Sequence, residues 1–182
     1  GQDCAIIFQE WLAALNPTMT IGNQVAEKRL SHTSMSGAEA WEEAGRLLKL
    51  VGIPNPEKRM KQYPHEFSGG QRQRIMIAIA LACQPRLLIA DEPTTALDVT
   101  IQADIIDLLK DIQKEFGMAV IMITHDLGIV ANIAKKIIVL DAGKVVEPGS
   151  SQDIFYRPRH PSTTARFQAL PTLDNAEALS TD

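Results

Sequence analysis

The chain has 182 residues, of which 45% are hydrophobic and 22% charged, a composition typical of a globular protein and not of a disordered or collagen-like chain. Its 18 basic and 22 acidic side chains give a net charge of −4, which disfavours nucleic acid as a partner. The longest apolar run, residues 75–83, is too short to cross a bilayer. Two cysteines without a Cys-x-x-Cys pair make neither a disulfide scaffold nor a zinc site, so we expect about one domain in a reducing compartment.

The first third of the chain predicts one strand followed by helices. Residues 4–8 form a short apolar run that suits a buried strand. A helix is predicted over residues 20–30, and a second one begins after Ser36, where Glu39 completes a capping box. Residues 11–66 contain no convincing strand, and we interpret them as a small helical subdomain.

From Phe67 onward, helices and strands alternate, which is typical of a parallel α/β sheet. The predicted elements are a helix at 71–83, a strand at 86–90, a helix at 100–116 and a strand at 118–123. The helix at 100–116 should bury one stripe of side chains, namely Ile101, Ile105, Leu108, Ile112 and Phe116. A hairpin at 137–140 and 144–146 and a short helix through Phe155 follow.

A glycine-rich segment, Ser68-Gly69-Gly70-Gln71, stands at the start of a predicted helix. Two glycines let the backbone approach an anion, and the first-turn amides of a helix point toward it, so the segment suits a phosphate. The alternative is a glycine turn that merely starts a helix.

Two carboxylates, Asp91 and Glu92, end an apolar strand, and ligands of α/β proteins collect at the carboxyl edge of the sheet. One acid can hold Mg²⁺ through water while its neighbour orients or deprotonates an attacking water. The alternative is that both acids cap a helix beginning near Pro93.

His125 follows the next strand and should emerge at the same sheet edge as Glu92. A single histidine there is more often a structural hydrogen-bonding group than a phosphate contact. Gln9, after the first strand, is by itself only a loop residue.

Taken together, these motifs stand in the order and approximate spacing of the ATP-binding-cassette (ABC) ATPases, which the chain resembles from Cys4 to about Gly149. The resemblance implies a P-loop NTPase-like α/β core with an inserted all-helical subdomain, and it implies ATP and Mg²⁺ as ligands. By this resemblance Gln9 is the Q-loop glutamine, and the signature loop runs from Ser68 to Gln71. Asp91 is the Walker B aspartate and Glu92 the catalytic glutamate. Asp98 is the D-loop aspartate, and His125 is the switch histidine. Gln9 and Asp91 would hold Mg²⁺, largely through water.

The implied organisation has four segments: a core strand with the Q-loop at 1–10, the helical subdomain at 11–66, the ATPase core at 67–149 and a C-terminal extension at 150–182. Phe8-Gln9-Glu10, Tyr63-Pro64-His65-Glu66 and the extension motifs His160-Pro161 and Ala169-Leu170-Pro171 are similar to the dipeptide/oligopeptide importer branch. Directly after His160-Pro161 this chain has Ser162, where that branch usually has an aromatic residue. No cysteine follows Cys83, which argues against the iron-sulfur cluster that some members hold in this extension.

The largest departure is that the 182 residues contain no G-x-x-x-x-G-K-[ST] loop. We expect the chain to be the C-terminal part of an ABC ATPase subunit, inactive by itself, whose parent hydrolyses ATP for an importer of peptides or similar solutes. The resemblance implies a second ATPase subunit, in a homodimer or heterodimer, permease subunits, indirectly a solute-binding protein, and a peripheral position on the cytoplasmic face of the inner membrane. The alternatives are a non-hydrolysing interaction module and, less favoured, an ABC ATPase acting on DNA or ribosomes, for which basic arms or coiled coils are missing.

Overall fold

A computed structural model describes residues 3–9 and 14–168 of the chain. It contains two compact units, Gly1–His125 and Asp126–Asp182, and each is considered by itself. Three predictions, for Glu10, Trp11 and the motif at 169–171, lie outside the described residues. In the described part, no helix is long and apolar enough to span a membrane.

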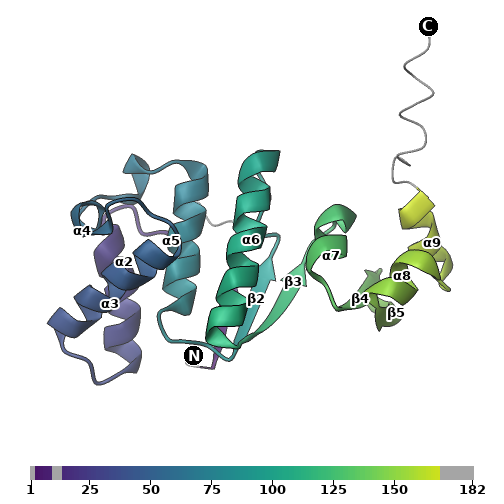
Figure 1. Cartoon of the computed structure of the whole chain (residues 1–182), viewed down its shortest axis with the longest axis horizontal. Helices are drawn as coiled ribbons and strands as arrows, with labels where there is room; N and C mark the ends of the chain where they lie inside the picture. Colours follow the sequence, from purple (N-terminus) through teal and green to yellow (C-terminus); the bar gives the residue numbers. More distant parts are fainter. Residues whose placement is uncertain (1–2, 10–13, 169–182) are drawn as a thin grey trace, which may run out of the picture. The chain divides into compact units, whose positions relative to one another are not determined.

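The first unit is built on a parallel sheet of three strands, β1 (Cys4–Ile7), β2 (Leu87–Asp91) and β3 (Ala119–Ile123), in the order β1-β2-β3 (Figure 1). The register pairs Ile7 with Ala90 and Asp91 with Ile123. Helix α5 (Gly69–Leu81) precedes β2, and helix α6 (Val99–Phe116) joins β2 to β3. The helix-strand alternation predicted from Phe67 onward is therefore confirmed, with element ends that differ by one or two residues.

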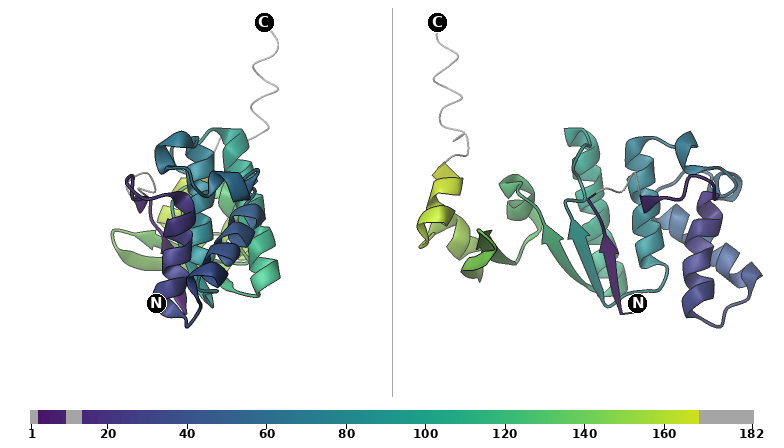
Figure 2. Two further views of the ribbon diagram at one scale, coloured as in Figure 1. Left: turned by 90° about the vertical axis from the view of Figure 1, so that its left-hand side faces the viewer. Right: turned by 180° about the vertical axis from the view of Figure 1, so that it is seen from behind.

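The two faces of this sheet differ in burial. Helix α6 lies across one face, where Leu88 and Ala90 are fully buried (Figures 1 and 2). The opposite face carries Ile6, Ile121 and Ile123, whose exposed fractions are 44%, 50% and 47%. Alternation of side chains along each strand produces this division into two faces.

The predicted stripe of α6 was partly wrong. Ile105 and Ile112 are buried as expected, but Ile101, Leu108 and Phe116 are only partly buried against the core. Ile106 and Leu109 are buried with Ile105 and Ile112, which forms an i, i+1, i+4, i+7 stripe. This stripe is rotated about the helix axis from the predicted one, since helical periodicity alone does not fix which of two adjacent apolar residues faces the core.

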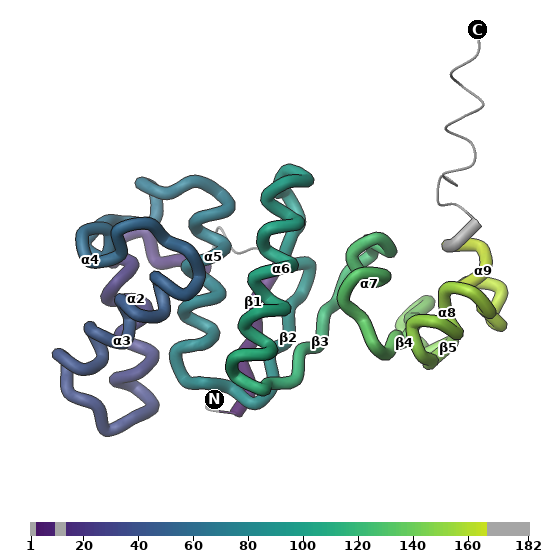
Figure 3. Tube along the Cα trace, in the orientation of Figure 1, coloured from purple at the N-terminus to yellow at the C-terminus, as the bar shows by residue number. Residues whose placement is uncertain are grey.

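Between β1 and α5 the regular elements of the described residues are helices, and none of residues 14–66 lies in a strand (Figure 3). The elements are α2 (Ile21–His32), α3 (Gly37–Leu50), α4 (Pro56–Arg59) and the 3-10 helix η1 (Pro64–Glu66). Helices α2 and α3 pack against each other and against α5. The predicted capping box at Ser36 is confirmed, because its side chain and that of Glu39 each accept a hydrogen bond from the other residue's backbone N–H.

The second unit consists of α7 (Leu127–Ile133), the antiparallel hairpin β4 (Lys136–Asp141) and β5 (Lys144–Ser150), α8 (Ser151–Tyr156) and α9 (Pro161–Gln168). Glu147 ties the segment before α9 to the hairpin, since its carboxylate accepts from the backbone N–H groups of Arg159 and His160 at 2.8 and 3.0 Å. Contact with the Thr163 side chain and these two backbone bonds lower the pKa of Glu147. The pairing of β4 with β5 confirms the predicted hairpin, which is longer than expected.

Candidate functional site

The carboxyl ends of the three parallel strands gather the predicted strand-end residues at one edge of the sheet. Gln9 lies two residues beyond Ile7, and Glu92 lies two residues beyond Ala90, the partner of Ile7 in the register. His125 lies two residues beyond Ile123, the partner of Asp91. Regular parallel pairing therefore places an amide, a carboxylate and an imidazole at neighbouring strand ends.

Glu92 and His125 are joined directly, because Nδ1 of His125 lies 2.6 Å from Oε1 of Glu92. The carboxylate accepts, so Nδ1 carries the proton in this contact and Nε2 faces away from Glu92 on the other side of the ring. The other carboxylate oxygen, Oε2, accepts from Oγ1 of Thr95 at 2.9 Å. Both oxygens of Glu92 are thus held by side chains that follow strands β2 and β3.

The environment of Glu92 keeps it ionised. Partial burial raises its pKa, but the hydrogen bonds from His125 and Thr95 lower it by more, and the net result is a pKa below the ordinary value for glutamate. The Glu92 side chain is 17% exposed, whereas that of His125 is 79% exposed. The arrangement presents a fixed carboxylate at neutral pH, which can orient a water molecule and accept its proton.

The turn after β2 is not a helix. Residues 93–96 form turns, and α6 begins only at Val99, so the alternative of a helix starting near Pro93 is wrong. Glu92 and Ala96 have φ angles of 47° and 66°, in the left-handed region that costs a non-glycine residue on the order of 1 to 3 kcal/mol. The surrounding contacts must therefore hold this turn in place.

Asp91 and Gln9 are the residues predicted to hold Mg²⁺, and both side chains carry oxygen atoms. Asp91 is the last residue of β2 and is partly exposed, and Gln9 is exposed beyond β1 at the same edge. One carboxylate and one amide oxygen suit Mg²⁺, which keeps several waters and takes few protein ligands. Among the described residues there is no cluster of three or more His, Cys, Asp or Glu side chains that would hold a metal by itself.

The segment Ser68 to Gln71 starts helix α5, as expected, with Ser68 as its N-cap. The backbone N–H of Gln71 donates to Oγ of Ser68 at 3.4 Å, and the backbone N–H of Ser68 donates to Oε1 of Gln71 at 3.3 Å. Gly70 lies against α6, where a Cβ would meet Cγ2 of Ile101 at 2.7 Å. The segment is therefore a helix start with an additional packing constraint, and the backbone amides of Gly69 and Gly70 in its first turn are suited to an anion.

Asp98 is the N-cap of α6, and its Oδ1 accepts from the backbone N–H of Ile101 at 3.0 Å. This contact gives the predicted D-loop aspartate a structural task in the free chain. Thr95, which binds Glu92, is a residue that the sequence reasoning left out of the site. Its position three residues after Glu92, at the closing end of a tight turn, is the signal that would have found it.

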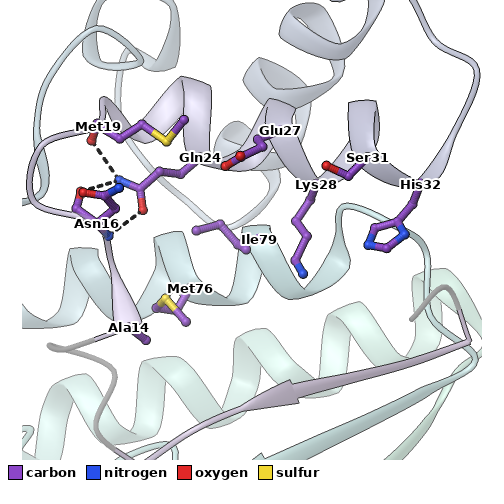
Figure 4. A pocket seen from close by; sticks show the side chains of 10 residues that line it. All are labelled: Ala14, Asn16, Met19, Gln24, Glu27, Lys28, Ser31, His32, Met76 and Ile79. Atoms are coloured by element: carbon purple, nitrogen blue, oxygen red, sulfur yellow. Dashed lines mark hydrogen bonds between the residues drawn. The ribbon is translucent and has the colours of Figure 1, made fainter.

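A pocket of about 360 Å³ lies between α2, α5 and the loop before α2 (Figure 4). Gln24 fixes that loop, because its Nε2 donates to the carbonyl oxygens of Asn16 and Met19 and its Oε1 accepts from the N–H of Asn16. The pocket combines apolar and charged side chains, and its lining includes Glu27, Lys28, Met76 and Ile79.

Comparison with protein families matches residues 1–95 to the ABC transporter family. The chain belongs to this family. The ATP-binding cassette MJ0796, solved as a dimer in a post-hydrolysis state with ADP and phosphate, is 32% identical, with a TM-score of 0.70 over 82% of this chain and 64% of that one. The expected fold, a P-loop NTPase-like α/β core, is thereby confirmed.

The chain is similar in sequence to several peptide-transport proteins. It is 54% identical to the oligopeptide transport ATP-binding protein OppD and 55% identical to the dipeptide transport ATP-binding protein DppD, both of Bacillus subtilis. These matches cover 97% and 96% of this chain but 49% and 52% of the relatives. The glutathione import ATP-binding protein GsiA of Escherichia coli is 51% identical over 98% of this chain and 29% of that protein. The chain thus spans about half the length of the first two relatives.

Proposed function

We propose that the chain belongs to the ATP-hydrolysing subunit of an ABC importer for peptides or related small solutes. The observation that carries the proposal is the Glu92–His125 pair, a 2.6 Å contact at the carboxyl edge of a parallel sheet. Membership in the ABC family supports the importer role, and the names of two relatives, an oligopeptide and a dipeptide transport ATP-binding protein, support the substrate class.

In the proposed ATP hydrolysis, one residue transfers a proton and its neighbours orient it. Glu92 takes a proton from the water that attacks the γ-phosphate, while His125 and Thr95 hold its two carboxylate oxygens. Asp91 and Gln9 are the residues that would hold Mg²⁺, whose charge offsets that of the phosphates. Positioning and charge stabilisation carry most of phosphoryl transfer, and rigid strand ends suit both.

In this proposal Ser68 to Gln71 serve a second ABC ATPase subunit. Two subunits pair head to tail, and the start of α5 contacts the γ-phosphate of the ATP that the partner holds, with Asp98 at the same interface. Support comes from the exposed position of Ser68 at a helix N-terminus, where backbone amides and the helix dipole favour an anion. The dimeric cassette MJ0796 shows that a relative pairs.

The pocket between α2 and α5 is proposed as the docking site for a permease subunit at the cytoplasmic face of the membrane. Its mixed lining suits a protein segment with both apolar and charged side chains. The proposal also implies an indirect link, through the permease, to an extracytoplasmic solute-binding protein.

The decisive experiment replaces the base. A P-loop segment fused ahead of Gly1 supplies the motif that the 182 residues lack, and ATP turnover is then compared between the wild-type fusion and Glu92→Gln. Loss of the base should lower turnover by about 10²- to 10⁴-fold while ATP binding is retained. Glu66→Gln is the matched control, because Glu66 is likewise a hydrogen-bonded glutamate, whose carboxylate accepts from the backbone N–H of Tyr63, but it lies in the short helix η1. Normal hydrolysis by the Glu92→Gln fusion would show that Glu92 is not the base.

A further inference from the structure

The turn that carries Glu92 is held from both sides by glutamine side chains. From α5, Nε2 of Gln73 donates to the carbonyl oxygen of Pro93 at 2.7 Å. From α6, Nε2 of Gln102 donates to the carbonyl oxygens of Thr94 and Leu97 at 3.2 and 3.1 Å. Two helices therefore fix three carbonyl groups within five residues of Glu92.

The Gln73 amide is oriented by Pro93. Gln73 is fully buried, and a carbonyl oxygen only accepts, so the nitrogen of the amide must face Pro93. Its Oε1 is buried and has no hydrogen-bond partner among the residues that the structure describes. An apolar side chain would avoid this unsatisfied oxygen but could not donate to Pro93. The contact with Pro93 is the feature that requires an amide here.

The turn itself needs such support. Glu92 and Ala96 both have positive φ, a conformation that persists only where the surroundings enforce it. Inside the turn, the N–H of Thr95 donates to the Glu92 carbonyl and that of Leu97 to the Thr94 carbonyl, each at 3.2 Å. At Glu92 itself, the backbone N–H donates to the carbonyl oxygen of Ile123 at 2.9 Å, and the side chain contacts Thr95 and His125. Gln73 adds the bond that comes from α5.

We infer that Gln73 is a positioning residue that fixes the Glu92 turn from helix α5, the helix that begins at Ser68. It lies five residues after Ser68 on α5, about 7.5 Å along the helix axis at 1.5 Å per residue. Gly70 also packs directly on Ile101 of α6, so the start of α5 and the Glu92 turn belong to one packed block. A displacement of Ser68 is thereby passed to the turn that holds Glu92. The inference rests on the proposed function, in which Ser68 meets a partner's ATP and Glu92 acts as the base.

Amide hydrogen exchange on the 182-residue chain tests the positioning without ATP. Gln73→Met keeps an unbranched side chain of similar size and removes the donor. Exchange of the Thr95 and Leu97 amides should become at least about tenfold faster, since both close the turn, whereas the Ile79 amide in α5 should change less than twofold. Gln73→Leu, which also lacks the donor, must give the same pattern. Ile77→Val, a change at a buried position of the same helix without a polar group, should leave all three amides unchanged.

The inference is overturned if the Thr95 and Leu97 amides keep their protection, or if protection falls equally in α5, which would make Gln73 an ordinary core residue. In the P-loop fusion, Gln73→Met should lower kcat about tenfold at unchanged KM for ATP, because Gln73 is fully buried and would act only through the Glu92 turn. A raised KM at unchanged kcat would also overturn it. Failure of the wild-type fusion to hydrolyse ATP would count against the proposed function and leave the exchange result to decide the role of Gln73.

Discussion

A methyl group at position 70 would lie 2.7 Å from Cγ2 of Ile101, closer than side-chain carbons approach in folded proteins. Ile101 is β-branched and stiff at χ1, so it cannot easily give way. At the residue scale, close packing against Ile101 therefore requires a glycine at position 70, whether or not the loop binds a phosphate. The phosphate hypothesis for this loop must consequently be tested at Ser68, where the side chain is not enclosed.

Gly70→Ala should lower the free energy of unfolding by about 1 to 3 kcal/mol, the usual cost of forcing an extra carbon into a packed contact. Gly37→Ala is the matched control, because Gly37 also lies in the first turn of a helix and a Cβ there would meet nothing within 4 Å. That control should be neutral or stabilising by up to about 1 kcal/mol. Urea unfolding of both variants gives the comparison, and equal stabilities would contradict the packing account.

At the scale of elements, the pocket between α2 and α5 offers a direct test of docking. Ser31→Trp places a large ring in the pocket lining, so retention of the chain on co-expressed permease subunits of a peptide importer should fall by at least about tenfold. Ser34→Trp is the control, since Ser34 is exposed and lies outside that lining. Undiminished retention of Ser31→Trp would show that this pocket is not the docking site.

The elements that could be predicted from the sequence are those specified by local signals. The capping box at Ser36 and the apolar strand at 87–91 each depend on residues within a few positions, and the structure contains both. Helix α9 was not predicted, because Pro161 reads as a helix breaker although proline is well tolerated at the first helical position.

In the candidate site too, the features that could be predicted are those that local sequence specifies. That Glu92 and His125 share a sheet edge follows from the strand pattern, since parallel strands end together. The left-handed turn at Glu92 and the contact from Gln73 to Pro93 depend on how α5 and α6 pack, and neighbouring sequence does not encode that. Roles for Gln9, Asp91 and Asp98 as ligands of Mg²⁺ or ATP stay predictions.

At the scale of the whole molecule, the central claim is that Ser68 completes the ATP site of a second subunit. Ser68 also caps α5, so a substitution there costs stability as well as any contact, typically about 0.5 to 2 kcal/mol. The chain provides its own control in Ser36, which caps α3 through the same kind of capping box. Ser68→Arg and Ser36→Arg therefore lose comparable caps, and only the first places bulk where the γ-phosphate would lie.

The most direct measurement is the mass, by light scattering, of the chain mixed with ATP and a complete, hydrolysis-dead ABC ATPase subunit, such as one derived from OppD of Bacillus subtilis. The account predicts an ATP-dependent complex for the wild-type chain and for Ser36→Arg, and none for Ser68→Arg. No complex with the wild-type chain, or an undiminished complex with Ser68→Arg, would contradict it.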